Sequence, residues 1–347
     1  MSNGFDNLDV IVIGGGLAGL TTTTFLARAG KSVTLFEQST KEIGGRARTS
    51  VFDGFYFNQG AHALYLSDAG AAVLRELGIV YTGGKPPTSR YELIHGKKYR
   101  LLIGSGSSVV GAKSLETSTE NMINQFFDSL NEIDFTKLEN VSVQEWIEGN
   151  VQNADAVEII KAFVRLNTYG NDPAIQSAGS VLHQFQISNL GGVMYLDGGW
   201  QTLVDGLVAA ATNAKARVVM GKKAVKVQRS NSEWIVTLSD RTQMSAKVLV
   251  IATGPRDAYG LFYDGERLRW CQKQSKSSNL YAWPALMLLL ATSPKVMRCS
   301  LWELIRLYTF RYILLMPSLL PRTEHLSTWQ NTWAHQSNQN QKKMNRN

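Results

Sequence analysis

DVIVIGGGLAGLTTTTFLARAGKSVTLFEQSTKEIGGRAR, residues 9–48, is the stretch that decides the fold of this chain. The apolar run at residues 10–13 is typical of a buried parallel strand. A G-x-G-x-x-G spacing follows it, and residues 17–28 then predict a helix. Residues 32–36 predict a second strand, which ends at an acidic residue. This order predicts a strand–helix–strand unit of an α/β fold built on a parallel sheet.

The glycines of this stretch predict a binding site for the ADP half of a dinucleotide. Gly14 permits a tight turn, Gly16 lets the backbone approach a pyrophosphate, and Gly19 lets the helix pack closely on the strand. The helix begins with Leu17 and Ala18, where free N–H groups and a partial positive charge favour phosphate. A glycine-rich turn by itself can be only a turn. Here the strand before it and the helix after it agree with the binding site.

An acid and a second glycine pair narrow the choice of cofactor. Glu37 lies 37 − 14 = 23 residues after the first glycine, near the roughly 20 at which an acid accepts hydrogen bonds from a ribose. Gly44, Gly45 and Arg46 follow closely, with a further arginine at Arg48. A nicotinamide site has no need of this pair. The alternative is that the pair is a plain loop and the arginines are solvated charges.

These motifs resemble the superfamily of flavin amine oxidases, phytoene desaturases and protoporphyrinogen oxidase. In that superfamily a GGR stretch follows the ribose-binding acid and meets the FAD diphosphate. The resemblance implies an FAD-dependent oxidoreductase with non-covalent FAD, which takes hydride from an amine, a porphyrinogen or a long polyene. It also implies a Rossmann-like FAD-binding domain, formed by a parallel sheet with a small antiparallel β-meander, and an inserted α+β substrate domain. It covers roughly residues 8–260.

Three further stretches support the resemblance. Residues 54–62, GFYFNQGAH, resemble the family segment that runs back under the flavin ring. Residues 195–207, YLDGGWQTLVDGL, resemble the glycine pair that opens a helix leading back to the FAD domain. Residues 216–254 alternate like a small antiparallel sheet that returns to the cofactor. The resemblance therefore places these additional residues at FAD: Gly60, Ala61, His62, Val225, Ala252, Thr253 and Gly254.

A catalytic acid or base does not stand out. His62 is a candidate because the resemblance places it near the isoalloxazine. The alternative, that its imidazole only makes local hydrogen bonds and has no catalytic role, fits the sequence equally well. His183 and Tyr195 are further candidates. Amine oxidases of the family carry a lysine near the flavin from their C-terminal half. Nothing in the sequence has metal-ligand spacing, so we expect no metal.

The sequence predicts a discontinuous FAD-binding domain, residues 1–85 and 196–265, with a substrate domain at residues 86–195. Helical patterns fall at residues 120–130, 143–149 and 154–166, and a short sheet is expected over 91–102 with a turn at His95–Gly96. Some apolar residues of this insertion are expected either to line a hydrophobic site or to form the core between helices: Phe126, Phe127, Trp146, Ile159, Ile160 and Phe163.

Composition changes abruptly near residue 266. The chain holds 36 Lys+Arg and 28 Asp+Glu, a net charge of +8. Residues 1–265 hold 24 and 25 of these, which leaves 36 − 24 = 12 and 28 − 25 = 3 for residues 266–347. All 30 glycines precede residue 266, although average usage of about 7% would place roughly six in the tail.

The family takes the last piece of its FAD domain, with a glycine turn, from its C-terminal part. A tail without glycine cannot supply that turn. We therefore interpret residues 266–347 as an atypical tail outside the family fold, read out of frame after a frameshift. A real apolar and basic extension is the alternative.

The basic charge is no argument for nucleic acid, because it lies in the tail without a recognition motif. We find no secretory signal and no apolar run that could span a bilayer. With only Cys271 and Cys299, no disulfide framework is expected. We expect a cytoplasmic protein whose partners are a small apolar substrate and an electron acceptor. Contact of the basic, aromatic tail with a membrane surface stays open.

Two other outcomes stay open. Rab GDP-dissociation inhibitors share this fold and bind prenylated partners without redox chemistry. The intact glycine motifs and Glu37 favour a working dinucleotide site instead. A chain that has lost its C-terminal segment would be an inactive enzyme or a pseudogene product.

Overall fold

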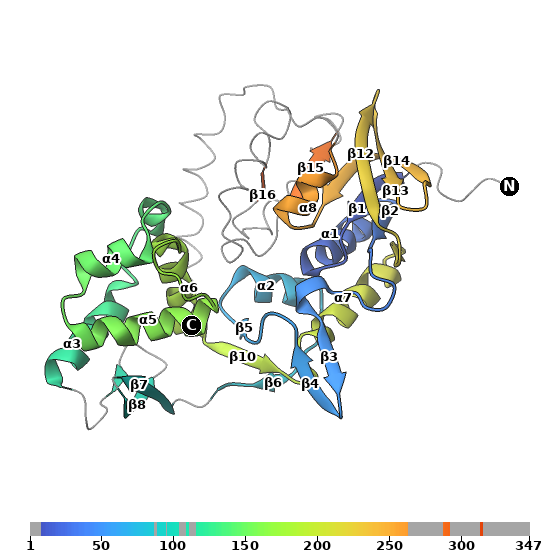
Figure 1. The fold of residues 1–347 in the computed structure, drawn as a ribbon. Coiled ribbons are helices and arrows are strands. Elements are labelled where there is room, and N and C mark those ends of the chain that lie inside the picture. Colours follow the sequence, from blue (N-terminus) through green and yellow to red (C-terminus); the bar gives the residue numbers. More distant parts are fainter. Residues whose placement is uncertain are drawn as a thin grey trace, which may run out of the picture. The chain divides into compact units, whose positions relative to one another are not determined.

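The computed structural model describes residues 8–86, 89–94, 96–103, 109–110, 116–262, 287–291 and 313–314. Its main sheet has the strand order β11-β2-β1-β14-β13-β12, and β15 pairs with both β14 and β16 (Figure 1). The strands are β1 (Leu8–Ile13), β2 (Val33–Phe36), β11 (Arg217–Val219), β12 (Ala224–Ser230), β13 (Glu233–Leu238), β14 (Gln243–Ile251), β15 (Met287–Ala291) and β16 (Ile313–Leu314).

The centre of this sheet is parallel, as the sequence predicts. β1 pairs in parallel with β2 on one side and β14 on the other, and β11 continues in parallel beside β2. β2 is buried throughout and β1 at every position except Asp9, which explains the uninterrupted apolar runs. α1 (Leu17–Arg28) connects β1 to β2 at the bounds expected from the sequence, and it packs against α7 (Gln201–Asn213).

The antiparallel meander consists of β12, β13 and β14, which pair in sequence order. The turns between them contain Asn231 and Arg241, both in the left-handed region of backbone space. One part of the expectation is wrong. Residues 217–219 form no meander strand but run parallel to β2. They follow α7, so the helix acts as a crossover that brings them into the parallel part of the sheet.

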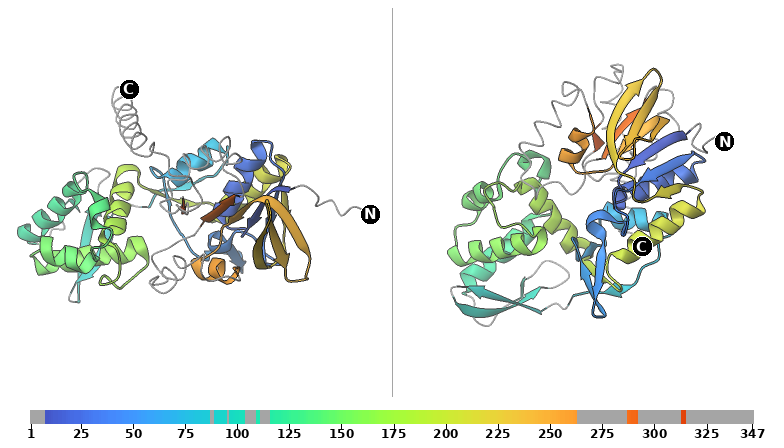
Figure 2. Two further views of the ribbon diagram at one scale, coloured as in Figure 1. Left: turned by 90° about the horizontal axis from the view of Figure 1, so that it is seen from above. Right: turned by 45° about the vertical axis from the view of Figure 1, so that its right-hand side comes forward.

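Several short elements were not expected from the sequence. β3 (Thr49–Phe52) and β4 (Phe55–Asn58) form a two-stranded hairpin, and α2 (Ala69–Glu76) follows it (Figure 2). A small sheet has β10 (Val193–Leu196) between β5 (Leu64–Tyr65) and β6 (Gly83–Gly84). β5 precedes α2 and β6 follows it, so this sheet joins both ends of the α2 segment to a strand more than a hundred residues later. Periodicity cannot reveal two-residue strands of this kind.

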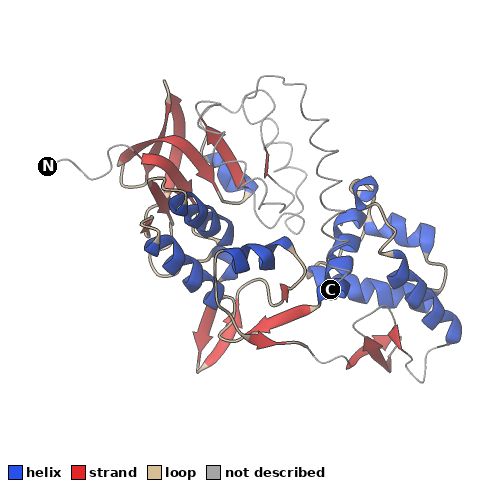
Figure 3. Ribbon diagram, turned by 180° about the vertical axis from the view of Figure 1, so that it is seen from behind, coloured by secondary structure: helices blue, strands red, loops and turns tan. Residues whose placement is uncertain are grey.

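The middle of the chain is mainly helical (Figure 3). Its helices are α3 (Thr117–Ser129), α4 (Val143–Asn150), α5 (Ala154–Thr168) and α6 (Ala178–Gly191), and its sheet is β7 (Ser89–Ile94), β8 (Lys97–Ile103) and β9 (Val109–Val110). The three helices expected here are confirmed, whereas α6 was not foreseen. Ser142 and Glu145 form a capping box at α4, and Asn153 and Ser177 cap α5 and α6. The expected β7–β8 hairpin is present, but His95 of its turn lies outside the described residues.

Two clusters of buried side chains stabilise these regions. One joins the main sheet with α1, α2 and α7, and the other joins α3, α4, α5 and α6. The residues expected either to line a hydrophobic site or to form a core belong to the second cluster: Phe126, Ile159, Ile160 and Phe163 are buried, and Phe127 and Trp146 are partly buried against them. They are therefore core. The domain boundaries and the interpretation of the tail stay predictions, and most of the tail lies outside the described residues.

Candidate cofactor site

The glycine-rich turn after β1 has no room for side chains at two of its three motif positions. Gly14 has a φ of +108°, and a Cβ added there would lie 2.6 Å from the carbonyl oxygen of Ala252. A Cβ at Gly19 would lie 1.9 Å from the carbonyl oxygen of Gly14. Both positions require glycine because backbone atoms occupy the space. The turn therefore has the close packing that the sequence predicts.

Gly16 differs from its two neighbours in the motif. A Cβ added there would meet only the carbonyl oxygen of Gly44, at 4.0 Å, which is ordinary contact. Gly16 is also the N-cap of α1, and no side chain caps the helix. The open space thus lies where the N–H groups of Leu17 and its neighbours begin the helix, and these groups favour an anion. Gly16, the second glycine of the motif, therefore leaves open space that protein atoms do not fill.

The second glycine pair is joined directly to the first turn. The N–H of Gly44 donates to the carbonyl oxygen of Gly15 at 2.9 Å, and Gly16 and Gly44 form a parallel bridge. Gly44 and Gly45 have φ values of +119° and +57°. A Cβ at Gly44 would lie 2.8 Å from the Val204 side chain of α7. The two motifs, about thirty residues apart in sequence, therefore form one loop pair above α1.

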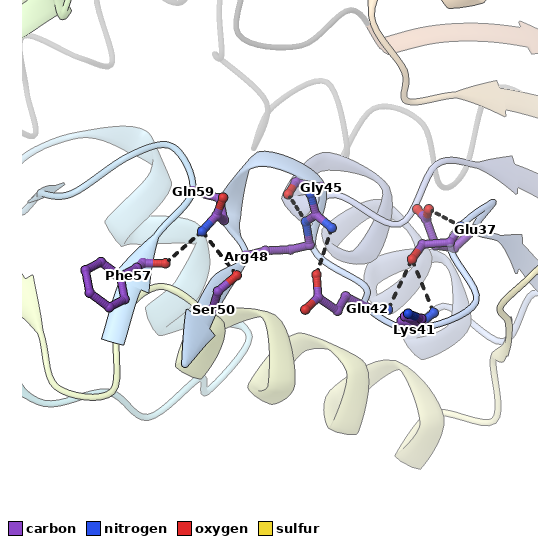
Figure 4. A network of polar contacts seen from close by, with 9 residues as sticks. Glu37, Lys41, Glu42, Gly45, Arg48, Ser50, Phe57 and Gln59 are labelled. Atoms are coloured by element: carbon purple, nitrogen blue, oxygen red, sulfur yellow. Dashed lines mark hydrogen bonds and ion pairs between the residues drawn. The ribbon is translucent and has the colours of Figure 1, made fainter. Parts of the chain in front are cut away.

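Glu37, at the end of β2, reaches over the same turn (Figure 4). Its Oε2 accepts a hydrogen bond from the Gly15 N–H at 2.8 Å, and its Oε1 accepts one from the Ser39 N–H at 2.8 Å. A carboxylate has about four acceptor positions, so two remain for the hydroxyls of a ribose. The predicted acid is therefore held at the turn by backbone contacts.

The two arginines of the GGRAR stretch have different surroundings, and Figure 4 shows those of Arg48. Arg48 donates from Nε to the Gly45 carbonyl at 2.9 Å and pairs through Nη1 with Glu42 at 2.8 Å. It therefore braces the loop, and the alternative of a purely solvated charge is wrong for it. Arg46 is exposed, and within the described residues its guanidinium has no hydrogen bond or ion pair. The Arg46 guanidinium is therefore not committed to another group in the described part of the chain.

The end of β14 completes one wall of the turn. The Ala252 N–H donates to the Ile13 carbonyl at 2.8 Å, which continues the parallel ladder past the strand ends. The Thr253 methyl would lie 3.2 Å from a Cβ added at Gly14. Gly254 accepts the first helical hydrogen bond of α8 (Pro255–Gly260), from Ala258 at 2.9 Å. The structure therefore brings Ala252 and Thr253 against the glycine turn.

The segment after the hairpin returns to the second glycine loop. A Cβ added at Gly60 would lie 2.4 Å from the carbonyl oxygen of Arg46, so this close approach requires glycine. Ala61 is half-buried, and His62 is exposed. The His62 ring meets the ring of Tyr169 edge to face, with centroids 5.5 Å apart. His62 therefore has an aromatic partner, and this geometry alone gives it no catalytic role.

Tyr169 belongs to a polar aromatic cluster that sequence reasoning missed. Gln184 of α6 donates to the Tyr65 hydroxyl at 2.8 Å and to the Asn167 carbonyl at 2.7 Å. Burial raises the pKa of Tyr65, and Tyr169 and Tyr195 nearby add to the increase. Burial likewise raises the pKa of Tyr169, again with a contribution from Tyr195. The three tyrosines and Gln184 come from β5, the end of α5, β10 and α6, so no local sequence pattern predicts the cluster.

Two remaining predicted residues lie elsewhere. Val225 lies at a bulge, where the β12–β13 register passes from Ala224 to Lys226 without it, and its side chain is exposed. His183 packs its ring 5.3 Å from the ring of Phe135, at the edge of the helical core. The His183 ring is therefore packed against an aromatic residue of the helical core.

The sequence is similar to a family of known proteins. The family model for flavin-containing amine oxidoreductases matches residues 17–340, which includes most of the tail. A carotenoid 3,4-desaturase from Haloarcula japonica is 34% identical over 102 residues, covering 29% of this chain and 19% of the desaturase. A putative flavin-containing monoamine oxidase from Mycobacterium tuberculosis is 25% identical over 283 residues, covering 74% of this chain and 59% of the oxidase.

Solved structures show the same fold. An oxidoreductase from Methanosarcina mazei has a TM-score of 0.65 and 18% identity, over 78% of this chain and 65% of its own. The chain thus spans less than two thirds of the length of each of these proteins. The α/β class with a mostly parallel sheet is confirmed.

In the part of the chain that the structure describes, no helix is long and apolar enough to cross a bilayer. Nor do three or more His, Cys, Asp or Glu side chains come together there as metal ligands.

Proposed function

Because the chain belongs to the flavin-containing amine oxidoreductase family, we propose that it oxidises a small apolar substrate by hydride transfer to FAD. FAD is the cofactor that membership implies, and flavin-dependent oxidoreductase is the class of enzyme. The observation that carries the proposal is the locked pair of glycine loops around an open, uncapped helix N-terminus.

The residues present fit FAD. The open face at Gly16 and the start of α1 suit the diphosphate, and the unpaired guanidinium of Arg46 supplies the opposite charge. Glu37 has acceptor positions left for the adenosine ribose. The sequence resemblance assigns the adenine contact to the backbone at Val225, where the bulge interrupts the ladder. The ADP half of the dinucleotide therefore has matching groups on this chain.

When bound, FAD supplies a two-electron acceptor. The protein's part is then to hold the substrate against it and to exclude water. Tyr169 and Tyr195 are 58% and 48% exposed. The Tyr169 ring meets the His62 ring, and Tyr195 lies near enough to raise the pKa of Tyr169. An apolar substrate suits such aromatic surfaces, and a carotenoid is the substrate named for one relative. An electron acceptor completes the proposed set of partners, which includes no nucleic acid.

The first experiment is an absorbance spectrum of the purified chain, before and after heat releases any bound molecule. Flavin bands, with released FAD near one per chain, are expected. A colourless protein that takes up no added FAD contradicts the proposal. That result favours a non-catalytic binding protein of the Rab GDP-dissociation-inhibitor type, or a chain inactivated by loss of its C-terminal segment.

The variant Gly16→Ala tests the site itself. Because the added methyl has room, the thermal stability of the protein without FAD should stay within about 0.5 kcal/mol of wild type. The methyl should nevertheless occupy space needed by the diphosphate and weaken FAD binding by about tenfold or more. Unchanged FAD affinity in a folded Gly16→Ala protein excludes the proposed diphosphate position.

A further inference from the structure

Tyr169, the C-cap residue of α5, has a backbone conformation that a tyrosine rarely adopts. Its φ is 57° and its ψ is 13°, in the left-handed region. Many helices end with one residue in this region, but that residue is usually glycine, because glycine has no side chain that clashes there. A bulky side chain makes the conformation unfavourable. The α5 helix therefore ends on a strained residue.

Hydrogen bonds fix the two residues that precede Tyr169. Gln184 of α6 donates to the Asn167 carbonyl at 2.7 Å. Gln176 donates from Nε2 to Thr168 Oγ1 at 2.9 Å. A strained residue persists only where its surroundings determine its conformation, and such residues gather at active sites and ligand-binding sites. The surroundings of Tyr169 meet this condition, so its strain calls for a functional reason.

The Tyr169 ring contacts the segment that returns to the second glycine loop. It meets the His62 ring edge to face, with centroids 5.5 Å apart, and a backbone hydrogen bond from His62 reaches its hydroxyl. His62 lies two residues after Gly60, where a Cβ would lie 2.4 Å from the Arg46 carbonyl oxygen. The Tyr169 side chain is nevertheless 58% exposed. The protein therefore places an open aromatic ring beside the cofactor loops.

The surroundings of this ring are aromatic and neutral. The groups that act on its hydroxyl are the His62 backbone and the Tyr195 phenol, and neither carries a charge at neutral pH. A tyrosine ring offers a flat apolar face on which another ring or conjugated system can stack. Ending α5 would require only a glycine. The ring itself is therefore the part of Tyr169 that the fold does not explain.

We propose that Tyr169 is a specificity-determining residue of the proposed oxidation site, where its exposed ring stacks on a flat, neutral, apolar substrate beside His62. The inference rests on the proposed function for the position of the flavin, but the stacking contact itself needs no bound FAD. The left-handed conformation is then retained because it directs the ring toward the ligand.

The test is titration of the full-length purified chain with Nile red, a flat, neutral dye whose fluorescence rises in apolar surroundings. Tyr169→Gly should weaken dye binding about tenfold, because the stacking ring is lost. The same variant should melt within about 2 °C of wild type or above it, because glycine relieves the left-handed strain. If Tyr169 served only the fold, its replacement would lower the melting temperature and leave dye binding unchanged.

The matched control is Lys215→Gly, after the end of α7. Lys215 is also exposed and also left-handed, with a φ of 67°. This control relieves the same kind of strain away from His62, so dye binding should stay within about twofold of wild type. The conservative variant Tyr169→Phe keeps the ring and should bind the dye within about threefold of wild type.

Three results overturn the proposal: a wild-type chain that does not bind the dye, equal dye affinity of Tyr169→Gly and wild type, or displacement of the dye by tetramethylammonium, which would assign the ring to a cation. If Tyr169→Gly does not fold, Tyr169→Asn repeats the test, because asparagine tolerates the left-handed region. Flavin content is measured in each preparation. A loss of dye binding in Tyr169→Gly protein, when wild type holds no flavin, supports the ligand contact and contradicts only the FAD proposal.

Discussion

The two buried clusters of this protein use side chains in opposite ways. Around the cofactor loops, function depends on side chains that are absent: at Gly14, Gly19 and Gly60 an added Cβ would lie 2.6, 1.9 and 2.4 Å from backbone oxygens. In the helical cluster, stability depends on large side chains that fill space, such as Phe163 and Ile160, both almost fully buried. The first region tolerates almost no change of shape, and the second tolerates exchange of similar volumes.

Substitution in the cofactor loops should have the largest effect. Gly19→Ala forces α1 away from the Gly14 carbonyl, so we expect a loss of about 4–5 kcal/mol of folding stability and no measurable FAD binding. Chemical denaturation and FAD titration measure the two effects. Gly30→Ala is the control, because no atom lies within 4 Å of a Cβ added there. Its φ of +76° is unfavourable for alanine, so we expect it to lose only about 1 kcal/mol of folding stability. Equal effects of the two substitutions would contradict the steric account.

A substitution in the helical cluster should separate the two regions. Phe163→Ala leaves a cavity among aromatic neighbours, including Phe127 at 5.4 Å between ring centroids, and should cost about 3–4 kcal/mol. We expect the helices to melt at a lower temperature by circular dichroism, with FAD affinity within about twofold of wild type. Leu166→Ala, at an exposed position of the same helix, is the control. A large loss of FAD affinity in Phe163→Ala would show that the two clusters act as one unit.

The tyrosine cluster connects the two regions, and its effect should be the smallest. Tyr65→Phe removes the hydrogen bond that Gln184 donates to the Tyr65 hydroxyl. We expect this loss to lower the free energy of unfolding by about 1 kcal/mol below pH 10. Because burial raises the pKa of Tyr65 above its ordinary 10.0, its contribution is present below pH 10 and is lost as pH rises through the higher folded-state value. Denaturation across alkaline pH should therefore show the variant approaching wild type. If the unfolding free energies of Tyr65→Phe and wild type differ by the same amount at every pH, the raised pKa of Tyr65 does not contribute to stability.

Local patterns were sufficient for the parts of the fold in which each residue's role is decided nearby. The bounds of α1, the parallel pairing of β1 and β2 and the positions of α4 and α5 follow from periodicity, capping residues and glycine spacing. The same spacing predicts Gly14, Gly16, Gly19, Glu37 and Gly44 as one site. In the structure the Glu37 side chain accepts from the Gly15 N–H, and Gly44 pairs with Gly15 and Gly16.

Other features depended on contacts between distant segments. The parallel position of β11, the sheet of β5, β10 and β6, and the cluster of Tyr65, Tyr169 and Gln184 have no local signal. The two arginines of the second glycine loop also look alike in the sequence. In the structure only Arg48 contacts Glu42 and the Gly45 carbonyl.

The class of fold, the cofactor motif and the family can be read from the sequence alone, because glycine identity and apolar period act within a few residues. Which of these glycines are required by packing follows from contacts between segments that are distant in sequence. That distinction depends on the space left around each Cα, which is open at Gly16 and filled at Gly14 and Gly19. The tertiary structure also decided that the aromatic residues of the hairpin face outward while those of α3 and α5 face inward, since exposure is set by neighbours that the local sequence does not contain.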